Sequence, residues 1–456
     1  MIGIGGSGMS GIARMLLAAG CAVSGSDAAL SPAVRYLQKL GAAVHIGHAA
    51  ANLPPQTEIV VRSEAVKADN PEVVAANARG LSVMTYAQAL GDLMRSYRGV
   101  AVSGTHGKTT TTALTAWILN RAGLKPNFVV GGKVPLLGGS SGAGEGDIFV
   151  AEACEYCRSF LNLTPEVAII NNIEEDHLDY YKDLAEIIDT FGLFVSRIPK
   201  SGLLVINGGD ANALKAAARA ACRRVTFGLS EDDDWRAVDI EYTPEYTAFD
   251  MLRGGKRLGR FRMKLAGEHN VMNALAASAV ADYFGVAART IAGALKAFDG
   301  VGRRFEELGE RDGVTVVTDY AHHPTAVRVT LRAAKIKYPG RRIWCVFQPH
   351  QCSRTRHLLG DFARSFSGAD MIVIPDIFSV RDTEEERRLI SSVDLVREIK
   401  AAGANARYIA SLDEILEHLV RNVRSGDVIL TMGAGSINEL AESFLAAISH
   451  VAEAKR

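Results

Sequence analysis

The chain lacks the features that mark several classes of protein. It has no excess of either charge, because the 51 lysines and arginines equal in number the 51 aspartates and glutamates. No polyelectrolyte such as nucleic acid is therefore implied as a partner. Six cysteines scattered over 456 residues do not make a disulfide framework, and a reducing cytoplasm is their natural setting. No apolar run approaches the roughly eighteen residues of a membrane span. We therefore expect a cytoplasmic protein without membrane insertion.

What remains is the composition of an ordinary globular protein, with 48% hydrophobic and 22% charged residues. The length predicts about three domains. Strand and helix patterns alternate along the chain, which indicates an α/β fold. One Cys-x-x-Cys pair, Cys154 and Cys157, has no second pair at zinc-finger spacing, so it is a weak indication of a metal or redox site.

The most informative stretch is residues 100–112. A short apolar run predicts a buried strand, a glycine turn follows, and Lys108 and Thr109 open a helical pattern. Backbone N–H groups and the helix dipole create an anion site there, to which Lys108 adds a full positive charge and Thr109 a hydroxyl for Mg²⁺. Val102 stands where the strict phosphate-loop pattern has glycine, so this is a shortened variant. The expected nucleoside-triphosphate contacts are Gly104, Thr105, His106, Gly107, Lys108, Thr109 and Thr110.

Residues 1–97 carry a second glycine loop. Residues 3–8 match G-x-G-x-x-G before a helical pattern, and the next strand, residues 21–27, ends in Asp27. This is the arrangement of dinucleotide folds, in which glycines allow close phosphate approach and the acid meets a ribose hydroxyl. The strand expected before the loop is nearly missing. The motif alone is weak evidence, and a nicotinamide cofactor is one candidate among several.

Two polar side chains follow buried strands close to the phosphate loop in the expected sheet. Glu152 ends the strand at residues 147–152, and His177 comes shortly after the strand at residues 167–173. Ligands bind at the carboxyl ends of parallel strands, so Glu152 is a candidate for Mg²⁺ and His177 for a second cation position. A salt-bridged glutamate and a capping histidine are the plain alternatives. Residues 267–273 open an alanine-rich helix with a polar start that could face a nucleobase.

At residues 300–305 a glycine-containing hinge leads into a third region. Four apolar strands there end in polar clusters, at residues 314–323, 343–350, 371–376 and 428–436. Polar groups at successive strand tips mark one crevice, and a domain on a hinge can close over a nucleotide.

With these segments in view, the chain resembles the Mur ligases, the ATP-dependent amide-forming enzymes of bacterial cell-wall synthesis. The resemblance covers essentially the whole length, and its motifs stand in family order. They are GIGGSGMSGIA, GTHGKTTT, NNIEEDHLDYY, GEHNVMNALAA, GVGRRFE, DYAHHPT, FQPHQCSRTR and MGAGSI.

The resemblance implies three α/β domains: a Rossmann-like UDP-binding domain at 1–97, a phosphate-loop ATPase domain with a parallel sheet at 98–302, and a Rossmann-like C-terminal domain at 303–456. It implies UDP-N-acetylmuramate, L-alanine and ATP as substrates, with Mg²⁺, in a monomer or homodimer. The UDP-sugar contacts would be Gly5, Gly6, Ser7, Gly8, Met9, Ser10 and Asp27. Further ATP contacts would be His269, Asn270, Asn273, Arg303 and Asp319.

The resemblance also assigns chemistry. Thr109, Glu152 and His177 would hold metal, and Tyr320, His322 and Arg354 would receive the amino acid. The implied catalytic residues are Lys108, His177, Arg303 and His322. Phosphoryl transfer from ATP would activate a carboxylate as an acyl phosphate, which an amine then attacks.

The chain departs from the commoner family pattern at three places. Residues 153–157 read Ala-Cys-Glu-Tyr-Cys, Gln351 replaces an arginine, and Phe191 stands where sister ligases have a carbamylated lysine. Three alternatives stay open. They are a related ligase that attaches a preformed peptide during wall recycling, a dinucleotide-dependent oxidoreductase and a non-catalytic nucleotide-binding regulator.

Overall fold

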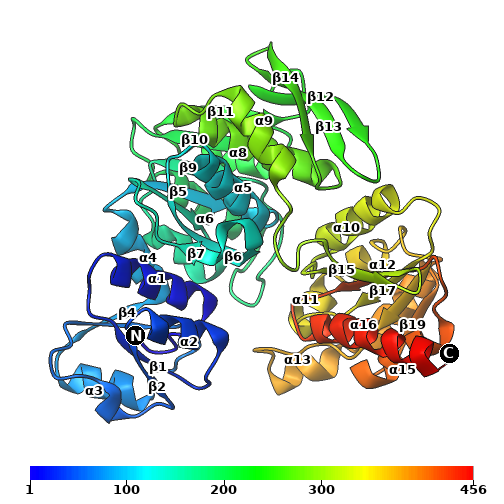
Figure 1. The fold of residues 1–456 in the computed structure, drawn as a ribbon, viewed down its shortest axis with the longest axis horizontal. Coiled ribbons are helices and arrows are strands. Elements are labelled where there is room, and N and C mark those ends of the chain that lie inside the picture. The colour runs from blue at the N-terminus through cyan, green and yellow to red at the C-terminus, as the bar shows by residue number, and fades with distance from the viewer. Residues whose placement is uncertain (455–456) are drawn as a thin grey trace.

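The structure, a computed structural model, describes residues 1–454, with side chains described as far as residue 448. Figure 1 shows three α/β bodies along the chain, from the blue N-terminal one through the cyan and green middle one to the yellow and red C-terminal one. The expected three-domain α/β fold is confirmed. No helix within residues 1–454 combines the length and apolarity needed to cross a membrane.

The N-terminal domain is built around its first four residues. Ile2 bridges in parallel to both Ser26 and Arg62, so it joins the pair β1–β2 to the pair β3–β4. The strand that looked nearly missing is therefore present as a short central segment. The elements are α1 (Ser7–Ala18), β1 (Ser24–Asp27), α2 (Pro32–Lys39), β2 (Ala43–Ile46), β3 (Ile59–Arg62), α3 (Pro71–Ala78), β4 (Ser82–Thr85) and α4 (Tyr86–Met94).

The middle domain is a ten-stranded sheet in the order β14-β13-β12-β11-β10-β9-β5-β8-β6-β7. Strands β12, β13 and β14 form an antiparallel extension that the sequence analysis did not predict. The elements are β5 (Arg98–Ser103), α5 (Lys108–Arg121), β6 (Asn127–Val134), β7 (Gly139–Gly142), β8 (Ile148–Glu152), β9 (Val167–Ile170), α6 (Leu184–Val195), β10 (Leu203–Asn207), α7 (Ala211–Ala217), β11 (Arg223–Gly228), β12 (Trp235–Tyr242), β13 (Thr247–Arg253), β14 (Lys256–Met263), α8 (Glu268–Tyr283) and α9 (Ala288–Ala297).

The C-terminal domain has a six-stranded sheet in the order β15-β16-β20-β17-β18-β19, parallel except for β15 at its edge. The four predicted strands are all present. The elements are β15 (Glu306–Arg311), β16 (Val314–Asp319), α10 (Pro324–Lys337), β17 (Ile343–Phe347), α11 (Cys352–His357), α12 (Leu359–Ala363), β18 (Met371–Ile374), α13 (Glu384–Leu389), α14 (Ser392–Ala401), β19 (Ala406–Tyr408), α15 (Leu412–Asn422), β20 (Val428–Met432) and α16 (Ile437–Ala454).

Helix α5 carries the phosphate loop and is buried on every side except at its ends. It packs against α8 and α9, and the indole N–H of Trp117 donates a hydrogen bond to the carbonyl of Ala294 at 2.9 Å. A helix without an amphipathic face is typical of the interior of a large domain. The loop at its N-terminus is therefore fixed from behind.

One face of the middle sheet packs on α6 through aromatic side chains. The ring of Phe194 is fully buried and stacks on Phe160 at a centroid distance of 4.6 Å. We expect Phe194→Ala to cost about 3–5 kcal/mol because it leaves a cavity, and to lower the thermal unfolding midpoint of the middle domain by several degrees. The neighbouring Leu193 is 44% exposed, so Leu193→Ala is the matched control and should change little. Equal shifts in the two variants, measured by calorimetry, would contradict this packing.

Candidate active site

The phosphate loop lies between β5 and α5 and is held from behind by Asn172. The N–H of Thr105 donates to the carbonyl of Asn172 at 3.0 Å, and the N–H of His106 donates to Oδ1 of the same residue at 2.7 Å. Gly107 has φ +78°, and a Cβ there would lie 2.6 Å from Asn273 Oδ1. Glycine is required at this position by both conformation and space.

Lys108 reaches back over its own loop. Its ammonium donates to the carbonyl oxygens of Gly104 and Thr105 and to Glu155 Oε1 at 2.9 Å. Burial lowers the pKa of Lys108, but the neighbouring carboxylates, Glu155 foremost, outweigh burial and raise it. Lys108 is therefore a cation whose side chain is largely buried, at 13% exposed. Sequence reasoning missed Glu155, which stood out only as part of an unusual Cys-Glu-Tyr-Cys segment.

The three predicted metal ligands divide into two groups. Thr109 Oγ1 donates to Glu152 Oε1 at 3.2 Å, and Gly131 N–H fixes the other oxygen of Glu152 at 2.8 Å. Nε2 of His177 lies instead 3.7 Å from Glu155, and its Nδ1 is buried without a hydrogen-bond partner. A hydroxyl and a carboxylate are the hard oxygen donors that Mg²⁺ prefers. The Thr109–Glu152 pair therefore fits Mg²⁺, whereas His177 belongs to the Lys108–Glu155 cluster.

The first turns of α8 face the phosphate loop, whereas the predicted contact of this helix with a nucleobase stays a prediction. Thr111 Oγ1 donates to Asn273 Oδ1 at 3.0 Å, and Asn273 donates to Asn270 Oδ1 at 3.1 Å. Burial lowers the pKa of His269 to about 4, so its imidazole is neutral near pH 7. All three of the predicted nucleotide contacts on α8 line the same cavity as the loop.

On the C-terminal side, the two hinge arginines, Arg303 and Arg304, contact different parts of the protein. Arg303 donates to the carbonyls of Gly433 and Gly435 at 3.1 Å each and is not part of the cavity wall. Arg304 is part of the wall and donates to Thr109 Oγ1 at 3.0 Å. The cation that crosses the hinge to the phosphate loop is thus Arg304, which sequence reasoning missed. The nucleotide-binding and catalytic roles of Arg303 stay predictions.

Asp319 ends strand β16 in the cavity wall. Its two oxygens accept hydrogen bonds from the N–H groups of Phe305 and Ala321, each at 2.7 Å. Burial raises the pKa of Asp319. Tyr320 and His322 follow in the same wall, and burial holds the pKa of His322 well below its usual range. The predicted nucleotide and amino-acid contacts of this segment therefore lie side by side.

Arg354 is engaged in a buried interdomain ion pair. Its Nε and Nη2 each lie 2.9 Å from Asp176 Oδ1, while Nη1 lies 3.1 Å from His350 Nδ1. Burial raises the pKa of Asp176, but Arg354 and the neighbouring histidines together outweigh burial and hold this pKa well below its usual range. Arg354 lies outside the wall of the large cavity, so its binding of the amino acid stays a prediction. Asp176 was not foreseen as a site residue.

The predicted UDP-sugar residues form one loop in the N-terminal domain. The N–H of Gly5 donates to Asp27 Oδ2 at 2.8 Å, and a Cβ on Gly5 would lie 2.9 Å from that oxygen. Helix α1 then begins at Ser7, with Met9 and Ser10 buried in its first turn. Asp27 thus fastens the loop. The assignment of Gly5, Gly6, Ser7, Gly8, Met9, Ser10 and Asp27 to the UDP-sugar stays a prediction.

The phosphate loop opens on a cavity of about 710 Å³. The middle domain forms one wall with the loop, β8 and the start of α8, and the C-terminal domain forms the other with residues 319–332. A volume of this order suits a nucleotide-sized ligand. Fold and site together define a nucleotide-binding protein of the phosphate-loop type whose site closes between two α/β domains.

Comparison with known proteins specifies the family. Three family profiles match in chain order: "Mur ligase family, catalytic domain" at residues 1–98, "Mur ligase middle domain" at 102–281 and "Mur ligase, glutamate ligase domain" at 303–435. The chain belongs to the Mur ligase family.

Its relatives include two proteins named UDP-N-acetylmuramate–L-alanine ligase. The one from Caldanaerobacter subterraneus is 44% identical over 97% of this chain and 96% of its own. The one from Clostridium acetobutylicum is 41% identical with the same coverage. Among solved structures, the UDP-N-acetylmuramate–alanine ligase of Thermotoga maritima superposes with TM-score 0.81 at 28% identity, covering 99% of this chain and 98% of that chain. A murein peptide ligase from Psychrobacter arcticus gives TM-score 0.71 at 28% identity, with 98% of both chains covered.

The Asp176–Arg354 pair predicts how the two domains respond to its loss. Removal of one partner leaves a buried charge uncompensated, at a cost of about 3–5 kcal/mol. We expect Asp176→Ala to open the middle and C-terminal domains and to increase the radius of gyration in small-angle X-ray scattering. Asp179, three residues on, is exposed, and Asp179→Ala is the control. An unchanged scattering profile for Asp176→Ala would show that the pair does not hold the domains together.

Proposed function

We propose that the protein joins L-alanine to the carboxylate of UDP-N-acetylmuramate at the expense of ATP, through an acyl phosphate, and releases ADP and phosphate. One observation carries the chemistry: the Lys108 loop opens on a cavity closed by Tyr320 and His322 of the hinged C-terminal domain. The near full-length relatives named for this reaction support the choice of sugar and amine. A cytoplasmic location, where ATP is available, is part of the proposal.

The side chains of the cavity suit phosphoryl transfer. In such transfers the protein mainly positions the groups and neutralises charge on the transferred phosphoryl group. Lys108 supplies a largely buried cation from the middle domain, and Arg304 supplies a second cation from the hinge. The Glu155 carboxylate holds Lys108 in place before a phosphate arrives. Neither the phosphoryl transfer to the carboxylate nor the attack of the amine on the acyl phosphate requires a covalent enzyme intermediate.

We propose that Thr109 and Glu152 hold Mg²⁺. They already lie 3.2 Å apart with hard oxygen donors facing one another, and when bound the ion would neutralise phosphate charge beside Lys108. His177 would bind a second cation. Alternatively, it would contact the acyl group together with the Lys108–Glu155 cluster. Its Nδ1, buried and without a partner, is the free donor or acceptor of that cluster.

Tyr320 and His322 in the cavity wall, together with Arg354 outside it, would receive the amine substrate. The nearest alternative is the recycling ligase that attaches a peptide to UDP-N-acetylmuramate. Such enzymes share the fold, as the Psychrobacter arcticus murein peptide ligase does. The relatives at 41–44% identity carry the alanine ligase name, and they favour the smaller amine.

Lys108 tests the ATP-dependent step. We expect Lys108→Ala to abolish phosphate release while UDP-N-acetylmuramate binding, measured by titration calorimetry, stays near normal, because the two sites lie in different domains. The exposed Lys125 of the same domain provides the control variant Lys125→Ala, which should keep full turnover. Retention of turnover within about tenfold, or ~1.4 kcal/mol, in Lys108→Ala would contradict the role.

The amine panel tests the substrate. One methyl group in a small pocket is worth about 1–3 kcal/mol, so L-alanine should exceed glycine and L-serine in kcat/KM by about ten- to a hundredfold. Alaninamide, which lacks the carboxylate, should be a poor substrate. Preference for L-alanyl-γ-D-glutamyl-diaminopimelate over alanine would identify the recycling reaction instead.

Arg354 needs a control because it also joins the domains. If its guanidinium binds the alanine carboxylate, Arg354→Ala should raise the KM for alanine more than that for ATP. It should also raise the alanine KM more than Asp176→Ala does, since that variant breaks the same ion pair but keeps the guanidinium. Equal effects of the two variants would restrict Arg354 to domain closure.

A further inference from the structure

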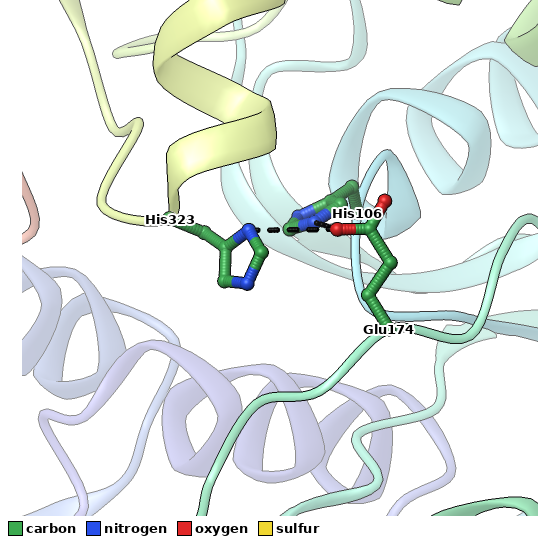
Figure 2. Close-up of side chains that lie close together, drawn as sticks. All are labelled: His106, Glu174 and His323. Carbon is green, nitrogen blue, oxygen red and sulfur yellow. Dashed lines mark hydrogen bonds and ion pairs between the residues drawn. The ribbon is translucent and has the colours of Figure 1, made fainter. Parts of the chain in front are cut away.

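Three side chains meet where the middle and C-terminal domains touch. His106 comes from the phosphate loop, Glu174 from the segment after β9, and His323 from the residue that caps α10 (Figure 2). They offer three ligand atoms within 4.8 Å of one another. We propose that His106, Glu174 and His323 form a binding site for one transition-metal ion of the zinc class, separate from the Thr109–Glu152 pair and bridging the two domains.

The spacing of the ligand atoms suits such an ion. His106 Nε2 lies 3.3 Å from Glu174 Oε2, and His323 Nδ1 lies 3.6 Å from the same oxygen. Bonds of about 2.0–2.1 Å in tetrahedral geometry separate neighbouring ligands by about 3.3 Å. The three atoms therefore need only small side-chain movements to share one ion. Two imidazoles and one carboxylate are a donor set typical of Zn²⁺ and its neighbours rather than of Mg²⁺.

The atoms next to the cluster orient two of the ligands. His323 Nε2 donates to the carbonyl oxygen of Glu175 at 3.1 Å, which leaves the lone pair on Nδ1 for the side of the ring that faces Glu174. Thr325 Oγ1 donates to Glu174 Oε2 at 2.7 Å. A ligating histidine whose other nitrogen donates to a backbone carbonyl, and a carboxylate held by a hydroxyl, are the usual outer partners of a metal site.

Without a cation, part of the cluster is poorly matched. Glu174 Oε2 and His323 Nδ1 are both acceptors, and they face one another at 3.6 Å. The Thr325 N–H reaches Nδ1 at a long 3.3 Å and compensates little. The rings of His106 and His323 lie with their centroids 4.7 Å apart. A metal ion between the three groups would accept these lone pairs as coordination bonds and so remove the repulsion between the two acceptors.

The position of the site has a consequence for the enzyme. Two ligands belong to the middle domain and one to the C-terminal domain, so the complete set exists only when the domains are in contact. All three residues also line the large cavity, where a fourth coordination position would open. Bound metal would therefore favour the closed arrangement.

The test is metal binding by the full-length protein, freed of metal and without substrates. We expect one equivalent of Zn²⁺ in titration calorimetry, and Co²⁺ should give a visible spectrum of low coordination number without a thiolate charge-transfer band. Glu174→Gln and His323→Ala should each weaken Zn²⁺ binding about tenfold or more. Zn²⁺ should raise the thermal midpoint of the wild-type protein but not that of these variants.

Two controls make the result decisive. His45→Ala removes an exposed histidine of the N-terminal domain, and Cys154→Ser with Cys157→Ser removes the exposed thiols of the middle domain. Both proteins should bind Zn²⁺ like the wild type. Absence of saturable binding, or binding that Glu174→Gln and His323→Ala leave unchanged, would overturn the proposal. Because no substrate is present, either outcome is independent of whether the protein is an alanine ligase.

Discussion

The buried ion pair between Asp176 and Arg354 is the constraint on which the closed site depends. Both side chains are less than a tenth exposed, so their desolvation is offset by the hydrogen bond and ion pair between them. The hydrogen bonds of Arg354 to His350, and the one that the His177 N–H donates to Asp176 Oδ1 at 2.7 Å, add to this compensation. Such a pair contributes little net stability, but it disfavours any arrangement that leaves one charge alone. It therefore selects one position of the C-terminal domain, the one in which Tyr320 and His322 face the phosphate loop across the cavity.

Much of the fold could be predicted because buried parallel strands are short segments rich in apolar and β-branched residues. The strands that carry Glu152 and Asp319 are of this kind. The antiparallel extension could not be predicted in this way, because β12 and β14 alternate buried with charged, exposed residues and contain no such run. The first strand was underestimated because two bridging neighbours, rather than length, give Ile2 its place in the sheet.

The sequence predicted the site as a set of separate motifs. The remaining site residues became apparent only from contacts between residues that are distant in the sequence. Glu155, Asp176 and Arg304 act through partners 47, 178 and 195 residues away in the chain, and no local pattern reports such distances. The choice between the two hinge arginines depended on the backbone, since Arg303 has a positive φ of 58° and turns its side chain to Gly433 and Gly435. By contrast, the loop from Gly104 to Thr109 was predictable because its chemistry is local to one turn.

The burial of α5 also affects the thermodynamics of nucleotide binding. The helix that carries Lys108 is surrounded by the sheet, α8 and α9, and Asn172 fastens the loop before it. The backbone there is ordered as the domain folds, so a ligand does not have to immobilise it. Binding energy can then be directed to the movement of the hinged domain. The middle domain stays rigid during the cycle, and the conformational entropy lost in each turnover is confined to the C-terminal domain that moves.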